Sequence, residues 1–309
     1  MSEVMREHHQ PTVRARRIRF ALCGCALLIA SALAFFAWQN FYPVQVSEGW
    51  RYSVAHDRLP KVASMIPMAD GTLILSQELD HGQGSIVQIA PNGSQKTLLN
   101  NLSKPDGMIA VRGGWVYSQE AEGAVVRYFK DGVSTDLFTG QKVQGLWDDG
   151  EYLYAIEDRK GDGRLLRYRW SDGALETIRD HLDEAESVTR CSDGRMLYTE
   201  KEKGVVRQLT NDGADPVVLA DLNQPTYLLC DQRGLWISED ATHRARLLLL
   251  DSQGRLQTVL SFLKAPQMLT PTPKGTYLFA EGGRDRILEI TPPGGDALSL
   301  PGRDPTQAN

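Results

Sequence analysis

The stretch "KPDGMIAVRGGWVYSQEAEG" (residues 104–123) occurs six times in variant form along the chain, and this repetition identifies the architecture. It holds two short apolar runs joined by a glycine turn, with Asp106 before the first run and Glu120 after the second. The residues that match Asp106 lie 38 to 43 residues apart, which is a regular repeat. They are Ala63, Asp106, Gln144, Glu186, Thr226 and Gln267.

Each copy continues with a third apolar run, such as "GSIVQI" (84–89), and a weaker fourth run, such as "QKTLLNNL" (95–102). Short runs rich in β-branched and aromatic residues, bounded by DG, GG, NG or KG turns, are typical of antiparallel strands. Four strands in about 40 residues is the pattern of a propeller blade. We therefore predict an all-β, six-bladed β-propeller over residues 43–301, since a two-sheet sandwich would not explain so regular a repeat. Either residues 44–54 or "ALSL" (297–300) could close the ring as an outer strand of the last blade.

The amino-terminal part of the chain predicts a membrane anchor. Residues 20–38 carry no charge, and their number matches the hydrocarbon thickness of a bilayer. Five arginines in residues 1–19 predict a cytoplasmic tail, which makes residues 20–42 a signal anchor and exports the propeller, into the periplasm if the cell is bacterial. Cleavage as a signal peptide after Ala34 is the alternative, although the apolar run continues past it. Residues 302–309 form a short tail.

The charge of the chain limits the kinds of partner that it can bind, and the cysteine content limits the number of disulfide bridges. After residue 19, acidic residues outnumber basic ones by eight, which argues against a nucleic-acid partner. Two of the four cysteines lie in the anchor, and Cys191 and Cys230 occupy similar places in successive repeats. They are therefore either one disulfide bridge or two small buried thiols.

The repeat resembles the six-bladed propellers of the senescence-marker-protein/gluconolactonase, NHL and strictosidine-synthase-like superfamily. "ISEDATHRARLLLLD" (237–251) is similar to the NHL blade pattern, and "KPDGMIAV…GGWVYSQE" resembles the gluconolactonase segment whose aspartate binds a divalent metal. "AESV" (185–188) and "VQGLWDDGEYLY" (143–154) resemble that family's glutamate and Asn-Gly-Leu segments, although Gln144 replaces the asparagine. The resemblance implies a propeller fold and, for the gluconolactonase-like members, metal-dependent hydrolysis.

The residues that match Asp106 should ring one mouth of the propeller channel, because they stand where each inner strand begins. Oxygen ligands in flexible geometry suit Ca²⁺. These positions contain no histidine or cysteine, the ligands that zinc prefers. We predict a divalent-metal site, with Ca²⁺ as the preferred ion, formed by Asp106, Gln144, Glu186 and Gln267. Asp106 and Glu186 are also the predicted catalytic residues. A polar, water-filled channel without an ion is the alternative.

Three further residues are candidates for substrate binding. Thr226 belongs to the same ring, and His81 and His243 fall in loops after the second run, where a general base could lie.

The second acid of the opening stretch predicts a structural role, because a catalytic residue is needed once and this glutamate ends the second run in every copy. A carboxylate there could accept backbone N–H groups that would otherwise be buried without a partner. The six residues are Glu78, Glu120, Glu157, Glu200, Glu239 and Glu281.

These observations favour a membrane-anchored, metal-dependent hydrolase of the lactonase or esterase type, acting on a small ester or lactone at the channel mouth. One alternative is a non-enzymatic binding or scaffold propeller for a protein, a glycan or an envelope polymer. The other is a strictosidine-synthase-like enzyme that uses a channel glutamate without metal.

Overall fold

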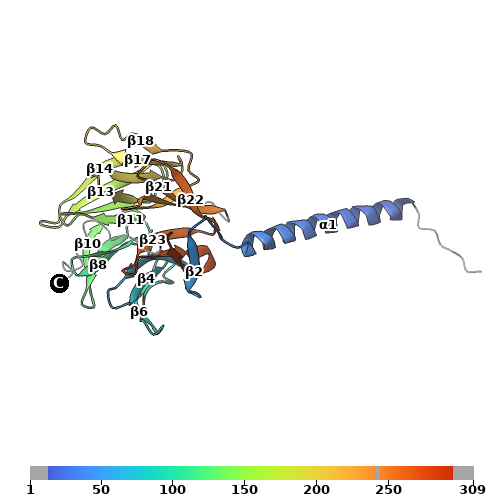
Figure 1. Ribbon diagram of the computed structural model, residues 1–309, viewed down its shortest axis with the longest axis horizontal. Coiled ribbons are helices and arrows are strands. Elements are labelled where there is room, and N and C mark those ends of the chain that lie inside the picture. Colours follow the sequence, from blue (N-terminus) through green and yellow to red (C-terminus); the bar gives the residue numbers. More distant parts are fainter. Residues whose placement is uncertain (1–12, 241–243, 295–309) are drawn as a thin grey trace, which may run out of the picture. The chain divides into compact units, whose positions relative to one another are not determined.

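The computed structural model of the 309-residue chain describes residues 13–240 and 244–294. The chain forms two compact units, Met1–Pro43 and Val44–Asn309. The first contains one long helix, α1 (Val13–Phe41), seen in Figure 1. Its segment Arg16–Trp38, with a mean hydropathy of 2.4, is long and apolar enough to cross a membrane, a property that signal sequences share.

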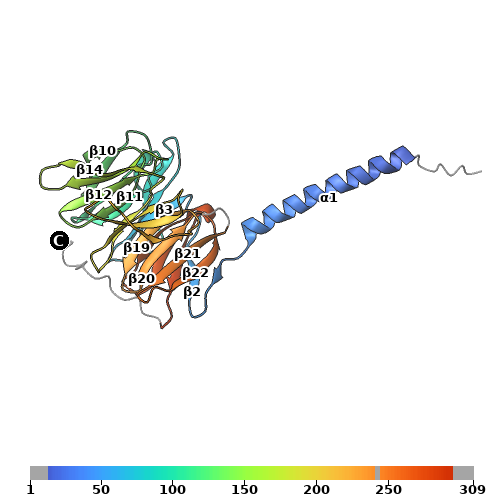
Figure 2. The same ribbon diagram turned by 90° about the horizontal axis from the view of Figure 1, so that it is seen from above.

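The second unit is a six-bladed β-propeller, so the predicted fold is confirmed (Figures 1 and 2). The innermost strands of neighbouring blades contact one another around the whole ring. Six apolar cores fill the spaces between consecutive blades, each built from the side chains of two blades. Burial between blades, rather than within any one blade, therefore supplies the hydrophobic stabilisation of the ring.

Each blade is an antiparallel sheet in which the innermost strand comes first in the sequence and the following strands lie progressively further from the centre of the ring. Blade 1 contains β3 (Val62–Pro67), β4 (Leu73–Gln77), β5 (Gly84–Ile89) and β6 (Gln95–Leu102). Blade 2 contains β7 (Met108–Val111), β8 (Gly114–Tyr117), β9 (Val125–Lys130) and β10 (Val133–Thr139). Blade 3 contains β11 (Val143–Asp148), β12 (Tyr152–Glu157), β13 (Gly163–Arg169) and β14 (Leu175–Leu182).

The second half of the ring has the same order, and its last blade is completed by a strand from the start of the unit. Blade 4 contains β15 (Val188–Arg190), β16 (Met196–Glu200), β17 (Val205–Leu209) and β18 (Val217–Leu219). Blade 5 contains β19 (Pro225–Asp231), β20 (Gly234–Glu239), β21 (Ala245–Asp251) and β22 (Leu256–Leu263). Blade 6 contains β23 (Pro266–Pro271), β24 (Tyr277–Glu281) and β25 (Arg286–Thr291), with the short helix η1 (Gly282–Arg284) between the last two.

The amino-terminal segment of the propeller closes the ring. β2 (Arg51–His56) pairs antiparallel with β25 and forms the outer strand of blade 6. β1 (Gln45–Val46) pairs with β22 and adds a fifth strand to blade 5. Of the two predicted ways to close the ring, the structure uses the amino-terminal one, while residues 297–300 lie outside the described residues.

Trp50, which lies between β1 and β2, belongs to the core that blades 5 and 6 share. It is 6% exposed, and its ring centre lies 5.4 Å from that of Trp236 in an edge-to-face contact. Loss of a buried tryptophan side chain from such a core costs about 3–5 kcal/mol. The segment is therefore attached to two blades by strand pairing and by a buried aromatic side chain.

Two glycines let the inner strands approach closely beside the predicted site. A Cβ atom on Gly107 would lie 2.0 Å from the carbonyl oxygen of Gln144, and one on Gly145 would lie 2.4 Å from that of Glu186. Both distances are far below van der Waals contact, so any other residue would push the strands apart. The glycines thus bring blades 2, 3 and 4 together where Asp106, Gln144 and Glu186 stand.

Candidate functional site

All inner strands begin at the same end of the ring, which we call the mouth. Four of the residues singled out from the repeat are the second residue of their inner strand, and the other two lie two residues before the first residue of theirs. The four are Ala63, Gln144, Thr226 and Gln267, and the two are Asp106 and Glu186. The spacing in the sequence therefore corresponds to one shared place in the fold.

Asp106 is held between three blades at the mouth. It is 5% exposed, and the side-chain Nε2 of Gln144 donates a hydrogen bond of 2.6 Å to its Oδ2. The hydroxyl of Ser64, from blade 1, donates to its backbone carbonyl. Burial raises the pKa of Asp106 well above its usual range, and the charges of Glu78 and Glu120 raise it further.

Three carboxylates form a group around this residue, which we call the carboxylate cluster: Glu78, Asp106 and Glu120. One oxygen from each lies within 4.8 Å of the other two. The ammonium group of Lys104 forms ion pairs with Glu120 and with Glu78, whose Oε1 lies 3.4 Å from Nζ. Burial raises the pKa of Glu78, because a single ammonium cannot offset both the desolvation and the neighbouring charge of Glu120.

A second group surrounds Lys201 on blade 4. Its Nζ lies 2.6 Å from Oε1 of Glu186 and 3.4 Å from Oδ2 of Asp240. Glu186 is 3% exposed, and burial raises its pKa to about 8 although Lys201 opposes the rise. Burial raises the pKa of Asp158 to about 6, with a further contribution from Glu120. A pKa of about 8 places the protonation equilibrium of Glu186 in the pH range that general acid–base catalysis uses.

The six glutamates assigned to one repeat position occupy two. The backbone N–H groups of Glu78, Glu120, Asp158, Lys201 and Asp240 donate to the same place in the preceding turn, which shows that these five residues are equivalent. The other four glutamates stand one residue earlier in their blades, at Glu157, Glu200, Glu239 and Glu281. Glutamines fill that earlier position in blades 1 and 2, at Gln77 and Gln119.

The four earlier glutamates have the contacts expected of a structural residue. Each is at most 2% exposed and accepts a backbone N–H from the turn that enters its blade. Each also pairs with an arginine on the third strand of the same blade. The arginines are Arg164, Arg207, Arg246 and Arg286. Glu78 and Glu120 instead belong to the carboxylate cluster at the mouth.

Three of the remaining predicted residues lie at the mouth, and no contact in the described part of the structure joins them to the cluster. Thr226 is buried, and its hydroxyl faces the backbone carbonyl of Ser238 at 3.4 Å. Gln267 is half-buried, and its backbone carbonyl accepts a hydrogen bond from Ser238. His81 is exposed in the turn after β4, and His243 lies outside the described residues.

Sequence reasoning missed both lysines and two of the aspartates at the mouth. Lys104, Lys201, Asp158 and Asp240 were not singled out, because only the glutamates were compared between repeats. Aligning the pair Gln77–Glu78 with the pair Glu157–Asp158 places Asp158, Lys201 and Asp240 in one register with Glu78 and Glu120. Lys104 lies in the turn before its inner strand and belongs to a different repeat position.

The carboxylate cluster has the donor set that a hard divalent cation prefers. Carboxylate and amide oxygens bind Ca²⁺, and three of the former lie within reach of one another. The side-chain Oε1 of Gln144 is buried and has no hydrogen-bond donor among the described residues, although Nε2 of the same amide contacts Asp106. The residues therefore fit such an ion.

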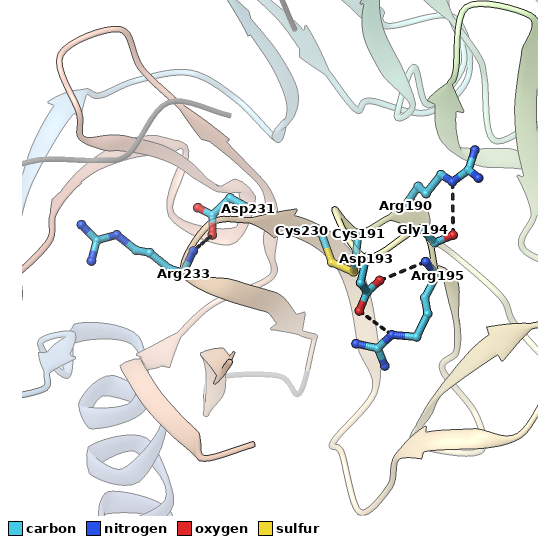
Figure 3. The surroundings of a disulfide bond; sticks show 8 residues. All are labelled: Arg190, Cys191, Asp193, Gly194, Arg195, Cys230, Asp231 and Arg233. Carbon is cyan, nitrogen blue, oxygen red and sulfur yellow. Dashed lines mark hydrogen bonds and ion pairs between the residues drawn. A yellow bond between two sulfur atoms is a disulfide. The ribbon is translucent and has the colours of Figure 1, made fainter. Parts of the chain in front are cut away.

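The disulfide lies at the other end of the inner strands (Figure 3). It joins Cys191, directly after β15, to Cys230 in β19, with Cα atoms 4.9 Å apart. Of the two states left open by the sequence, the structure therefore has the bridge. A cavity of about 190 Å³ is lined by both cysteines and by residues of blades 4 and 5, and a cavity of about 530 Å³ lies between β2 and the hairpin of β5 and β6. Neither is lined by residues of the carboxylate cluster.

No protein-family model matches the chain, and no curated protein matches it in sequence. Solved structures share its fold. A gluconolactonase from Xanthomonas campestris is 14% identical with a TM-score of 0.65, over 81% of this chain and 95% of that one. A streptogramin B lyase is 14% identical with a TM-score of 0.57, over 80% and 100%. A catalytically inactive virginiamycin B lyase from Staphylococcus aureus, solved with quinupristin, is 15% identical with a TM-score of 0.55, over 80% and 93%. At these identities the likeness establishes a common propeller architecture.

Proposed function

We propose that this propeller is a divalent-metal-dependent hydrolase of the lactonase or esterase type that acts at the mouth. The observation that carries the proposal is the convergence of Glu78, Asp106 and Glu120 at the mouth. A fold shared with a gluconolactonase supports it. One buried and two half-buried carboxylates share one ammonium, so a divalent cation would neutralise the excess of negative charge when they are ionised.

The carboxylate cluster and Oε1 of Gln144 would hold the ion. When bound, a divalent cation polarises an ester carbonyl and lowers the pKa of water. In lactone hydrolysis the oxygen of water bonds to the carbonyl carbon, the acyl–oxygen bond breaks, and a proton of the water passes to the released alkoxide. The chain must therefore orient the ester and carry that proton.

Glu186 is the proposed proton carrier. Its pKa of about 8 lets it accept a proton from water and return it to the leaving alkoxide near neutral pH. Lys201 fixes the orientation of its carboxylate through the 2.6 Å contact with Oε1. The charge of Glu186 contributes to the raised pKa of Asp106, which supports a role for both acids in the same reaction.

We also propose that α1 is an uncleaved anchor with its amino terminus in the cytoplasm and that the propeller is extracytoplasmic. The arginines before the apolar segment support this orientation. The Cys191–Cys230 bridge supports an oxidising compartment. Retention in the membrane after alkaline extraction, together with protease sensitivity of the propeller from the outside only, is the expected result. A soluble exported protein would instead indicate cleavage of the segment.

The function is tested on the purified full-length chain with a panel of lactones and short esters, with and without chelator. We expect hydrolysis that EDTA abolishes and Ca²⁺ restores, and we expect Asp106→Asn to lose it. Asp136→Asn, an exposed change in the same blade, is the matched control and should retain activity.

Other outcomes favour the alternatives. Turnover that ignores the chelator but is lost in Glu186→Gln would favour metal-free acid–base chemistry. Absence of turnover across the whole panel would overturn the proposal in favour of a binding propeller.

A further inference from the structure

Lys104 already places a cation in the carboxylate cluster. Its ammonium forms an ion pair with Oε2 of Glu120 and lies 3.4 Å from Oε1 of Glu78. Its backbone N–H donates to the carbonyl of Leu79, which fixes the start of the side chain at the junction of blades 1 and 2. Two of the three carboxylates are thus partly neutralised by a charge that belongs to the chain.

A divalent cation and this ammonium cannot use the same oxygens at once. Ca²⁺ needs its ligand oxygens at about 2.3–2.6 Å, so an ion held by all three carboxylates would lie beside Nζ in its present position. Like charges at that separation repel strongly in a partly buried site. The side chain of Lys104 is 28% exposed and ends a flexible four-carbon stem, so the ammonium can turn towards solvent.

We propose that Lys104 is a tethered competitor that sets the affinity of the carboxylate cluster for a divalent cation, an inference that rests on the proposed function. The ion binds only by displacing the ammonium from Glu78 and Glu120. The competition weakens binding, which places the site among extracellular modules with dissociation constants of about 10⁻⁴ to 10⁻³ M. The site would then fill where calcium is abundant and stay with its lysine where calcium is scarce.

Lys201 provides a control within the same ring. Its ammonium also contacts two carboxylates, those of Glu186 and Asp240. Within the described residues, however, these acids form no group of three with oxygens within 4.8 Å of one another. Removing Lys201 therefore removes an equal charge from the mouth without freeing a set of ligands.

The test measures binding rather than turnover. The full-length protein in detergent is titrated with Tb³⁺ by sensitised luminescence and with Ca²⁺ by thermal shift, as wild type, Lys104→Met and Lys201→Met. We expect Lys104→Met to bind at least about tenfold more tightly than wild type and to gain more thermal stability from Ca²⁺. We expect Lys201→Met to stay within about threefold of wild type.

Two further variants keep the result interpretable. Lys104→Gln retains hydrogen-bonding capacity and should give the same gain if Lys104→Met folds poorly. Adding Asp106→Asn to Lys104→Met should abolish the gain, and tight binding that survives this change would place the ion elsewhere and overturn the proposal. Equal affinity of wild type and Lys104→Met would refute competition while leaving the metal site intact. No binding by either would refute both the competition and the metal-dependent function.

Discussion

Replacing Glu239 by glutamine tests the structural role of the four buried glutamates. The carboxylate of Glu239 is fully buried and accepts three hydrogen bonds. One comes from the backbone N–H of Asn223 at 2.8 Å, and two come from Nε and Nη2 of Arg246, both at 2.6 Å. Glutamine has nearly the same shape but no charge, and its amide nitrogen cannot accept a hydrogen bond.

The cost follows from the groups that lose their partner. Breaking a buried ion pair costs about 3–5 kcal/mol, because the remaining charge stays without compensation. The side chain of Arg246 is 37% exposed and can regain water, so we expect the lower end of that range. A loss of about 3 kcal/mol lowers the melting temperature of a domain of this size by about 6–12 °C.

Glu120→Gln is the matched control, since it makes the same chemical change at the mouth. There it removes one of three mutually repelling carboxylates, while Lys104 keeps its contact with Glu78. We expect a shift of less than about 3 °C in either direction. Scanning calorimetry of both variants at pH 7 measures the difference. Equal destabilisation by Glu239→Gln and Glu120→Gln would refute the division of the glutamates into two groups.

Three further outcomes are expected. Asp215 accepts two hydrogen bonds from Arg179, and although burial would raise its pKa, these and other hydrogen bonds lower the pKa to about 2. Asp215→Asn should therefore lower the free energy of unfolding in urea by about 3 kcal/mol at pH 7 and have little effect at pH 2. An equal effect at both pH values would contradict this. The pKa of Glu186 is raised from 4.5 to about 8, so the wild type should lose stability as the pH rises between these two values. Glu186→Gln should therefore flatten the pH dependence of the melting temperature between pH 5 and pH 8. An unchanged slope would count against this role of Glu186. Cys191→Ser should cost about 4 kcal/mol from a loop of 39 residues, and a reductant should lower the stability of the wild type but not of the variant.

Most of the fold could be predicted from the sequence repeat. The alternation of side chains along a strand explains why the glutamates of different blades were aligned one residue out of register. Spacing and turn residues located the inner strand of every blade, because a blade needs four short strands and three turns in about 40 residues. The ring of Asp106, Gln144 and Glu186 followed from the same spacing. Comparing Glu78 and Glu120 with Glu157 failed because successive side chains in a strand point to opposite faces, so a slip of one residue exchanges the turn-binding position for the mouth.

Contacts between distant parts of the chain were beyond such reasoning. Nothing local to Lys104 or Lys201 indicates that either lies against two carboxylates from different turns. These pairings depend on how adjacent blades are rotated around the ring, which the repeat length alone does not specify.

Closure of the ring by β2 has a consequence for the order of events during synthesis. Arg51 pairs with Thr291, so the first long strand to emerge finds its partner only after nearly the whole propeller has been made. Until then both edges of β2 are unpaired, and the core that Trp50 completes between blades 5 and 6 is open. The slow step of folding should therefore be this final joining, and the nascent chain should depend on chaperones until the last blade arrives.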